Sequence, residues 1–248
     1  MNIVAEYKMQ KIFQQNWESF CASSAPFPVQ EKAAHAIMNC KTGSLGFSVS
    51  RCQDCGHIEI HNNSCRNRNC PNCQAVQNEI WVDQRREEVI DSPYFHVVFT
   101  LPHELNPLLY CNQTLLYSLF HKCCSQTLLD LSQNPKYLGA VPGIIQVLHT
   151  WNQELSYHVH MHCIVSGGGL TKNRQVKTSK GTFFIPVRVL REKFKGKYLS
   201  LLEEYYRCGK LVFSASCEKL RNPYEWKEFK DLLYGKDWCP FIKETFRG

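Results

Sequence analysis

The sequence YHVHMHCIVSGGGL, residues 157 to 170, decides how the second half of this chain folds. His158, His160 and His162 alternate with apolar residues, and a period of two predicts a β-strand. Successive side chains of a strand point to opposite faces, so the imidazoles share one face and the apolar residues face a core. Alternate side chains lie roughly 6.6 Å apart along a strand, close enough for two ring nitrogens to converge on one metal ion. The stretch therefore predicts a metal site, the alternative being a half-exposed strand that merely carries histidine.

Three consecutive glycines, residues 167 to 169, follow the histidines. Glycine adopts backbone conformations that are closed to other residues and leaves room for close approach. We therefore expect a sharp turn here that admits a bulky ligand near the end of the strand.

Composition limits the class of protein. The chain has 248 residues, of which 44% are hydrophobic and 21% charged, as in a globular protein with one large domain or two modest ones. Neither a run of 18 apolar residues nor a secretory signal is visible, so no membrane partner is expected. The formal net charge of +7 is compatible with a polyanionic partner but does not single one out.

Fourteen cysteines without a secretory signal indicate a reducing compartment, in which clustered cysteines bind metal more often than they form disulfides. We therefore predict a cytoplasmic protein. Two CxxC motifs, Cys52 with Cys55 and Cys70 with Cys73, are separated by fourteen residues. This spacing predicts one structural Zn²⁺ bound by four thiolates. A second zinc stays open, because further candidate ligands lie nearby: Cys40, Cys65, His35, His57 and His61.

Basic residues lie next to both motifs. Arg51, Arg66 and Arg68 flank the cysteines among several asparagines, and Lys172 and Arg174 follow the three glycines. Arginine, lysine and asparagine in such positions suit phosphate and base contacts, so these five are the predicted DNA-binding residues. A solvated loop is the alternative interpretation.

Periodicity and helix-breaking residues predict an α+β fold, with an antiparallel-rich sheet and helices packed on it. Helices are expected at residues 5–22, 28–40, 74–91, 114–131 and 187–207. Strands are expected at residues 45–52, 57–61, 94–101, 144–151, 158–165 and 183–185. We divide the chain into a helical and zinc-knuckle domain, residues 1–92, and a second domain, residues 93–248.

Four segments resemble a known family in the same order along nearly the whole chain. They are NSCRNRNCPNCQ at residues 63–74, YFHVVFTLPHEL at 94–105, LHTW at 148–151 and the histidine stretch at 158–170. They resemble the two-tyrosine HUH transposases of rolling-circle insertion sequences, which carry an N-terminal zinc-binding domain. The resemblance implies a ferredoxin-like HUH nuclease core acting on single-stranded or hairpin DNA ends.

In such a core the catalytic histidine pair would be His160 and His162, holding Mg²⁺ or Mn²⁺ against the scissile phosphate, with His158 as a third candidate ligand. The resemblance implies that a tyrosine attacks the phosphorus and leaves a 5′-phosphotyrosine intermediate.

The chain departs from the family in one respect. The family's nucleophilic tyrosines lie on a helix beyond the segment that resembles residues 238–248, where this sequence stops. Tyr205 and Tyr206 lie on an earlier helix whose family counterpart is not catalytic, so we expect them to serve packing. The resemblance thus implies a shortened transposase. A catalytically inactive, zinc-dependent DNA-binding remnant or regulator of the element is the alternative, and a metal-dependent hydrolase that uses water is a third interpretation.

Overall fold

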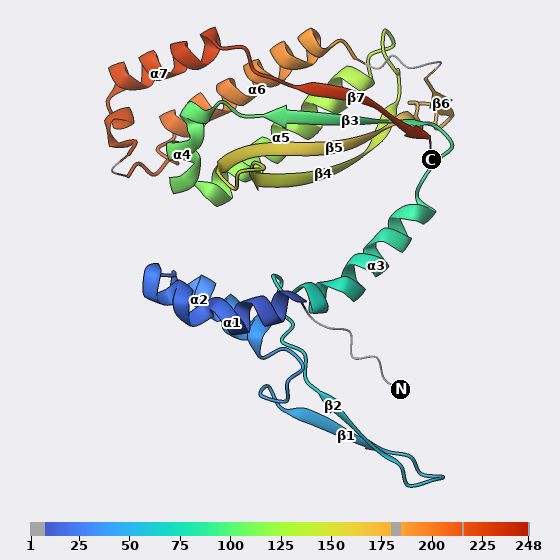
Figure 1. The fold of residues 1–248 in the computed structure, drawn as a ribbon. Helices are drawn as coiled ribbons and strands as arrows, with labels where there is room; N and C mark the ends of the chain where they lie inside the picture. The colour runs from blue at the N-terminus through green and yellow to red at the C-terminus, as the bar shows by residue number, and fades with distance from the viewer. Residues whose placement is uncertain (1–7, 180–184, 215, 248) are drawn as a thin grey trace. The chain divides into compact units, whose positions relative to one another are not determined.

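The computed structural model describes residues 8–179, 185–214 and 216–247, apart from a few side chains at the ends. Contacts divide the chain into two units, Met1–Val89 and Ile90–Gly248 (Figure 1). The predicted boundary after residue 92 falls where the first strand of the second unit begins. Most of the predicted strand at residues 183–185 lies outside the described residues. No described helix has both the length and the apolar character needed to cross a bilayer.

The first unit consists of two helices, a β-hairpin and a longer helix. These elements are α1 (Lys8–Ser23), α2 (Pro28–Met38), β1 (Phe47–Arg51), β2 (Ile58–Asn62) and α3 (Pro71–Glu87). Pro28 and Pro71 each begin a helix, where the missing N–H costs nothing and the fixed φ favours the first turn. The buried core of this unit is small: Ile37, Cys40 and Cys70, with Phe13, Cys65 and Cys73 packed against them. So small a core is typical of a domain that depends on a metal.

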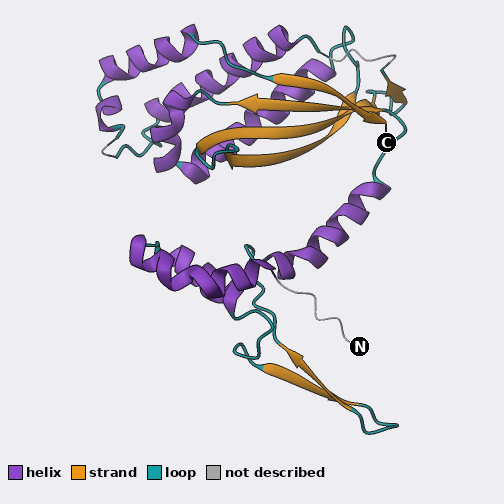
Figure 2. Ribbon diagram, in the orientation of Figure 1, coloured by secondary structure: helices purple, strands orange, loops and turns teal. Residues whose placement is uncertain are grey.

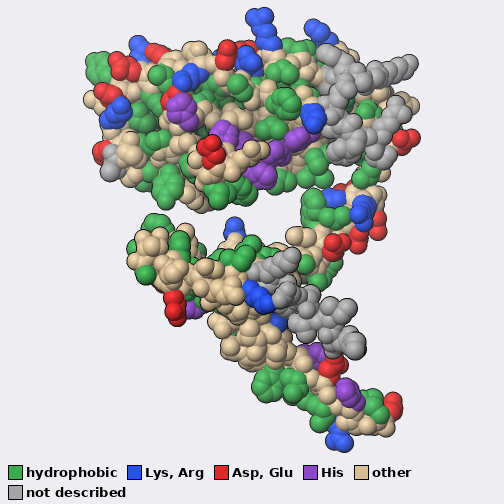
Figure 3. Space-filling view, in the orientation of Figure 1, with side chains coloured by type: hydrophobic (Ala, Val, Ile, Leu, Met, Phe, Trp, Pro, Cys, Tyr) green, Lys and Arg blue, Asp and Glu red, His purple; other side chains and the backbone are tan. Residues whose placement is uncertain are grey.

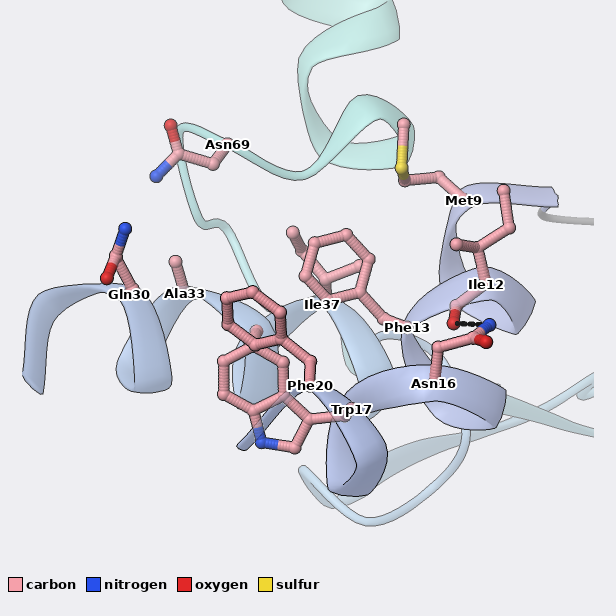
Figure 4. A pocket seen from close by; sticks show the side chains of 11 residues that line it. Met9, Ile12, Phe13, Asn16, Trp17, Phe20, Gln30, Ala33, Ile37 and Asn69 are labelled. Carbon is pink, nitrogen blue, oxygen red and sulfur yellow. Dashed lines mark hydrogen bonds between the residues drawn. The ribbon is translucent and has the colours of Figure 1, made fainter. Parts of the chain in front are cut away.

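An apolar cavity of about 530 Å³ opens between α1 and α2 (Figure 4). Phe13, Trp17 and Phe20 of α1 line it together with Ile37 of α2. No His, Cys, Asp or Glu side chain lines this cavity, so it holds none of the metal-binding chemistry that the sequence predicts.

The second unit is a sheet with helices on one face (Figures 1 and 2). Its strands are β3 (Pro93–Thr100), β4 (Val141–Trp151), β5 (Tyr157–Leu170), β6 (Val176–Thr178) and β7 (Phe241–Arg247). Its α-helices are α4 (Asn106–Cys111), α5 (Gln113–Ser132), α6 (Val187–Arg207) and α7 (Pro223–Gly235). The main strands lie in the order β4-β5-β3-β7, and each neighbouring pair is antiparallel.

This topology is that of a ferredoxin-like fold. Along the chain the main elements follow the order β3, α5, β4, β5, α6, β7, so that a helix precedes the second and the fourth main strand. In the sheet, β5 and β3 form the central pair. The α+β prediction and its antiparallel sheet are therefore confirmed. The sequence analysis missed α4, α7, β7 and the short β6. β7 is a strand at the edge of the sheet, where little burial is available to create an alternating pattern.

The alternation in β5 separates the two faces of the sheet as predicted. Val159, Met161 and Cys163 are buried in the core that α5 and α6 complete, whereas the histidines occupy the opposite, open face. Phe99 of β3 packs into the same core, with its ring centre 4.7 Å from that of Phe194 on α6.

The expectation of a sharp turn at the three glycines was wrong. Residues 167–169 remain in β5, where Gly169 pairs with β4 and both Gly168 and Gly169 pair with β6. A Cβ on Gly169 would lie 2.1 Å from the carbonyl oxygen of Val141, and one on Gly167 would lie 2.8 Å from that of Pro93. The glycines are needed because neighbouring backbone approaches too closely for a side chain, and the space is filled by protein.

Candidate metal centres

Three histidines converge on the open face of the sheet. One ring nitrogen each of His149, His160 and His162 lies within 4.8 Å of the other two. Strand register explains the cluster, because His149 of β4 is directly opposite His160 of β5 and both side chains leave the same face. Histidine side chains gather on one side of the second unit in Figure 3.

Hydrogen bonds fix which ring nitrogen of His160 and of His162 is free. Nδ1 of His160 lies 3.1 Å from the carbonyl oxygen of His158; a carbonyl only accepts, so this nitrogen carries the proton. Nδ1 of His162 lies 2.7 Å from Nε2 of His96 on β3, and the two rings stack with centres 5.0 Å apart. Both Nδ1 atoms are thus occupied, which leaves Nε2 of each ring to bind a metal.

The cluster favours neutral imidazoles. Burial and, to a smaller extent, the neighbouring His149, His160 and His96 together lower the pKa of His162 to about 4. Burial and His160 also lower the pKa of His149. Neutral rings offer the lone pairs that metal coordination requires, so the donor set fits a divalent cation.

The structure brings together two of the three histidines predicted on β5. His160 and His162 join the cluster, whereas His158 lies beside it, with its ring centre 5.1 Å from that of His160. The third member is His149, which the sequence analysis placed on a strand without assigning it a role. The missing information was the register of β4 against β5, which the sequence does not contain.

Four cysteines form a second cluster in the first unit. The sulfur atoms of Cys40, Cys65, Cys70 and Cys73 all lie within 4.8 Å of one another. Cys73 Sγ is 3.6 Å from Cys40 Sγ and 3.5 Å from Cys65 Sγ. Thiolates on a tetrahedral zinc with bonds of about 2.3 Å are roughly 3.8 Å apart, so the four sulfurs fit one structural Zn²⁺.

The thiols of this cluster influence one another's protonation. Burial raises the pKa of Cys73, but hydrogen bonds from Cys65 and Cys40 outweigh it and bring the value to about 7. Burial raises the pKa of Cys40 and of Cys65. One thiol is therefore poised to ionise first near neutral pH, as a metal ligand must.

The predicted ligand set of Cys52, Cys55, Cys70 and Cys73 does not come together. Cys70 and Cys73 lie in the cluster, but Cys52 and Cys55 lie exposed at the turn between β1 and β2. At the other end of the hairpin, the amide of Lys41 donates to the carbonyl of Asn63 at 3.1 Å. Cys40 precedes Lys41, and Cys65 lies two residues after Asn63. The base of the hairpin therefore brings Cys40 and Cys65 together, whereas Cys52 and Cys55 lie at its opposite end.

The predicted DNA-binding side chains are exposed. Arg51, at the end of β1, and Arg66 and Arg68, in the cysteine loop, face solvent in the first unit. Lys172 and Arg174 face solvent in the loop between β5 and β6 of the second unit. Their role in DNA binding remains a prediction.

Tyr205 and Tyr206 lie at the C-terminal end of α6, partly buried against the core. The hydroxyl of Tyr206 donates to the carbonyl of Arg221 at 3.1 Å, and its ring stacks on Trp226 with ring centres 4.1 Å apart. The helix that carries them packs against the core, whereas the histidines occupy the open face of the sheet. These contacts are what a packing role requires.

Fold and clusters together define a class: a two-unit α+β protein with a four-cysteine centre and a histidine centre on a ferredoxin-like sheet. Comparison with protein families is more specific. Residues 12–101 match the "Transposase zinc-binding domain" model, and residues 143–248 match a model described as "Putative transposase".

Two curated relatives agree with these matches. The chain is 38% identical over 239 residues to "Putative transposase y4qJ" of Sinorhizobium fredii, covering 96% of this chain and 60% of the relative. It is 30% identical over 158 residues to the "Transposase for insertion sequence element IS801" of Pseudomonas savastanoi pv. phaseolicola, covering 63% of this chain and 38% of the relative. No solved structure matches. The chain belongs to the IS91 family of insertion-sequence transposases with an N-terminal zinc-binding domain, and spans about 60% of the length of the more similar of these two relatives.

Proposed function

We propose that this chain binds single-stranded ends of an insertion sequence and takes part in metal-dependent cleavage and transfer of the DNA strand. One observation carries the proposal: three imidazoles converge on the open face of a ferredoxin-like sheet in a chain of this family. The open face can receive an extended nucleic acid strand, because α5 and α6 cover the opposite one (Figure 1).

In this proposal, Nε2 of His160 and of His162 and one nitrogen of His149 would hold Mg²⁺ or Mn²⁺. Hard cations prefer oxygen ligands, so three imidazoles leave the rest of the coordination shell to water and phosphate oxygens. A bound cation would polarise the phosphoryl oxygens of the scissile group. His96 orients His162 through the hydrogen bond to Nδ1, and the carbonyl of His158 orients His160.

The four-cysteine cluster would hold a structural zinc that orders the first unit. Arg66 and Arg68 lie in the loop between two of its ligands, Cys65 and Cys70, and are free to reach DNA phosphates. Arg51, Lys172 and Arg174 add positive charge elsewhere on the surface. Reduced thiols are what such a site needs, which supports the prediction of a cytoplasmic protein.

The covalent step requires a tyrosine that α6 does not supply. Tyr206 is engaged in a stack and a hydrogen bond, and Tyr205 packs against the core. We therefore assign neither residue the role of nucleophile. The alternative, an inactive DNA-binding regulator, shares the binding of DNA and lacks the covalent step.

The test is to incubate the chain with labelled single-stranded element ends and Mn²⁺, and to follow binding by fluorescence anisotropy and covalent capture by denaturing electrophoresis. We expect binding that Mn²⁺ strengthens and that rising salt weakens, because phosphate contacts release counterions. The matched control is His149→Ala, which should bind DNA without the Mn²⁺ effect.

Three outcomes would change the proposal. Absence of binding at low salt would exclude the nucleic-acid function. Cleaved DNA without an adduct would favour the hydrolase, with water as nucleophile. An adduct that disappears in Tyr205→Phe or Tyr206→Phe would assign the nucleophile to α6. An adduct that forms only when a longer natural reading frame supplies further tyrosines would support the assignment made here.

A further inference from the structure

The turn between β1 and β2 has the geometry of a metal-binding knuckle. The amide of Cys52 donates to the carbonyl of His57 at 2.8 Å, and the amide of Gly56 donates to the carbonyl of Cys52 at 3.1 Å. Gly56 has φ +70°, which closes the turn directly after Cys55. Backbone amides of Cys55 and Asp54 approach the sulfur of Cys52, as does the thiol of Cys55. The turn therefore presents two neighbouring sulfurs, as a metal-binding knuckle does.

The two sulfurs have no further ligand from the described part of the chain. Within 4.8 Å, no third His, Cys, Asp or Glu ligand atom of the described residues forms a group with them. The other cysteines of this unit that approach one another are members of the four-cysteine cluster. All ten residues of β1 and β2 are exposed. Two thiolates are half of the tetrahedral set that zinc requires.

We propose that Cys52 and Cys55 bind a second Zn²⁺ that is shared with the same two cysteines of a second copy of this chain. Each copy supplies two thiolates, so the shared ion reaches the closed four-sulfur set of a structural site. The symmetry is that of a two-fold dimer, in which the same residues meet across the axis. This dimer does not depend on the function proposed above.

The surface of the hairpin supplies a second reason for a partner copy. Phe47, Val49, Ile58 and Ile60 point to one face, because Val49 pairs with Ile60 and Arg51 pairs with Ile58. These four side chains are 56–62% exposed. An isolated two-stranded hairpin is marginal in water, and a second hairpin tethered at the turn lies within reach of this apolar face.

The test measures mass and metal together on the full chain in a non-thiol reductant, which excludes disulfide dimers. Light scattering after gel filtration should give a dimer, and elemental analysis about three zinc ions for two chains. The double variant Cys52→Ser with Cys55→Ser should give a monomer with about one zinc ion. The matched control, Cys21→Ser with Cys208→Ser, removes two other exposed cysteines and should remain a dimer.

Several results would overturn the proposal. They are a monomeric wild-type chain in the presence of zinc, a dimer that persists in the Cys52→Ser, Cys55→Ser variant, and a monomer that holds two zinc ions. The last result would mean that His57 or another side chain of the same copy completes the site. Circular dichroism of the double variant, expected to match the wild type because the turn is exposed, checks that it folds.

Discussion

His149 is the residue whose role the structure changes most. Its ring lies 5.3 Å from that of His160 and 4.6 Å from that of His162, centre to centre. His149→Ala should weaken Mn²⁺ binding at least about tenfold, close to the effect of His160→Ala, because each removes one of three nitrogen ligands. Isothermal titration with Mn²⁺ measures this. His158→Ala is the comparison: a loss as large as that of His149→Ala would return His158 to the ligand set.

His96 is a second single residue that should affect metal binding, although it is not one of the three clustered histidines. Its ring holds Nδ1 of His162 at 2.7 Å, so His96→Phe should let the His162 ring rotate and weaken metal binding about tenfold. His96→Gln retains a polar group that can bond to Nδ1 and should recover part of the affinity. Equal losses in the two variants would show that the ring fills space and does not orient His162.

At the scale of elements, Glu203 joins α6 to α7. Its carboxylate accepts hydrogen bonds from Trp226 Nε1 at 2.8 Å and from Lys230 Nζ at 3.1 Å. The bond from Trp226 is the main cause of the lowered pKa of Glu203; burial opposes it, and Lys230 and Arg207 add to it. This carboxylate therefore stabilises the folded state.

A pH dependence follows from that shift. The folded-state pKa of Glu203 lies below the usual 4.5, so its contribution is complete above that pH and is lost as pH falls through the folded-state value. Glu203→Gln should lower the free energy of unfolding by about 1–2 kcal/mol at pH 7 and by less at pH 3. Urea unfolding at both pH values measures this. Glu204→Gln, on the exposed neighbour, should change neither, and an equal effect there would contradict the role of Glu203.

At the scale of the whole molecule, the two units should respond differently to loss of zinc. The first has a core of only a few buried residues around the cysteines, whereas the second has a large apolar core. A strong chelator should therefore unfold residues 40–75 and leave the sheet of the second unit folded. Limited proteolysis with mass spectrometry should place new cleavages in the first unit alone. Protection that persists there after zinc removal would mean that the thiols pack without metal.

The sequence by itself determined strands β3, β4 and β5 and helices α5 and α6 of the second unit, the face of β5 that carries histidine, and the presence of a cysteine metal site. These features depend on residues close together along the chain, where a period of two or a CxxC spacing has a direct structural meaning. The resemblance of four short segments, not their periodicity, predicted the ferredoxin-like core, and the strand order agrees with it.

Only the tertiary structure decided which residues of distant segments meet. His149 joins His160 because of the register of β4 against β5, and a register is set by packing across the whole strand pair. Cys40 and Cys65 replace Cys52 and Cys55 because the base of the hairpin, not its turn, meets the start of α3. Position 169 requires glycine because the backbone of β4 leaves no room for a Cβ, a contact between distant segments that no local pattern records.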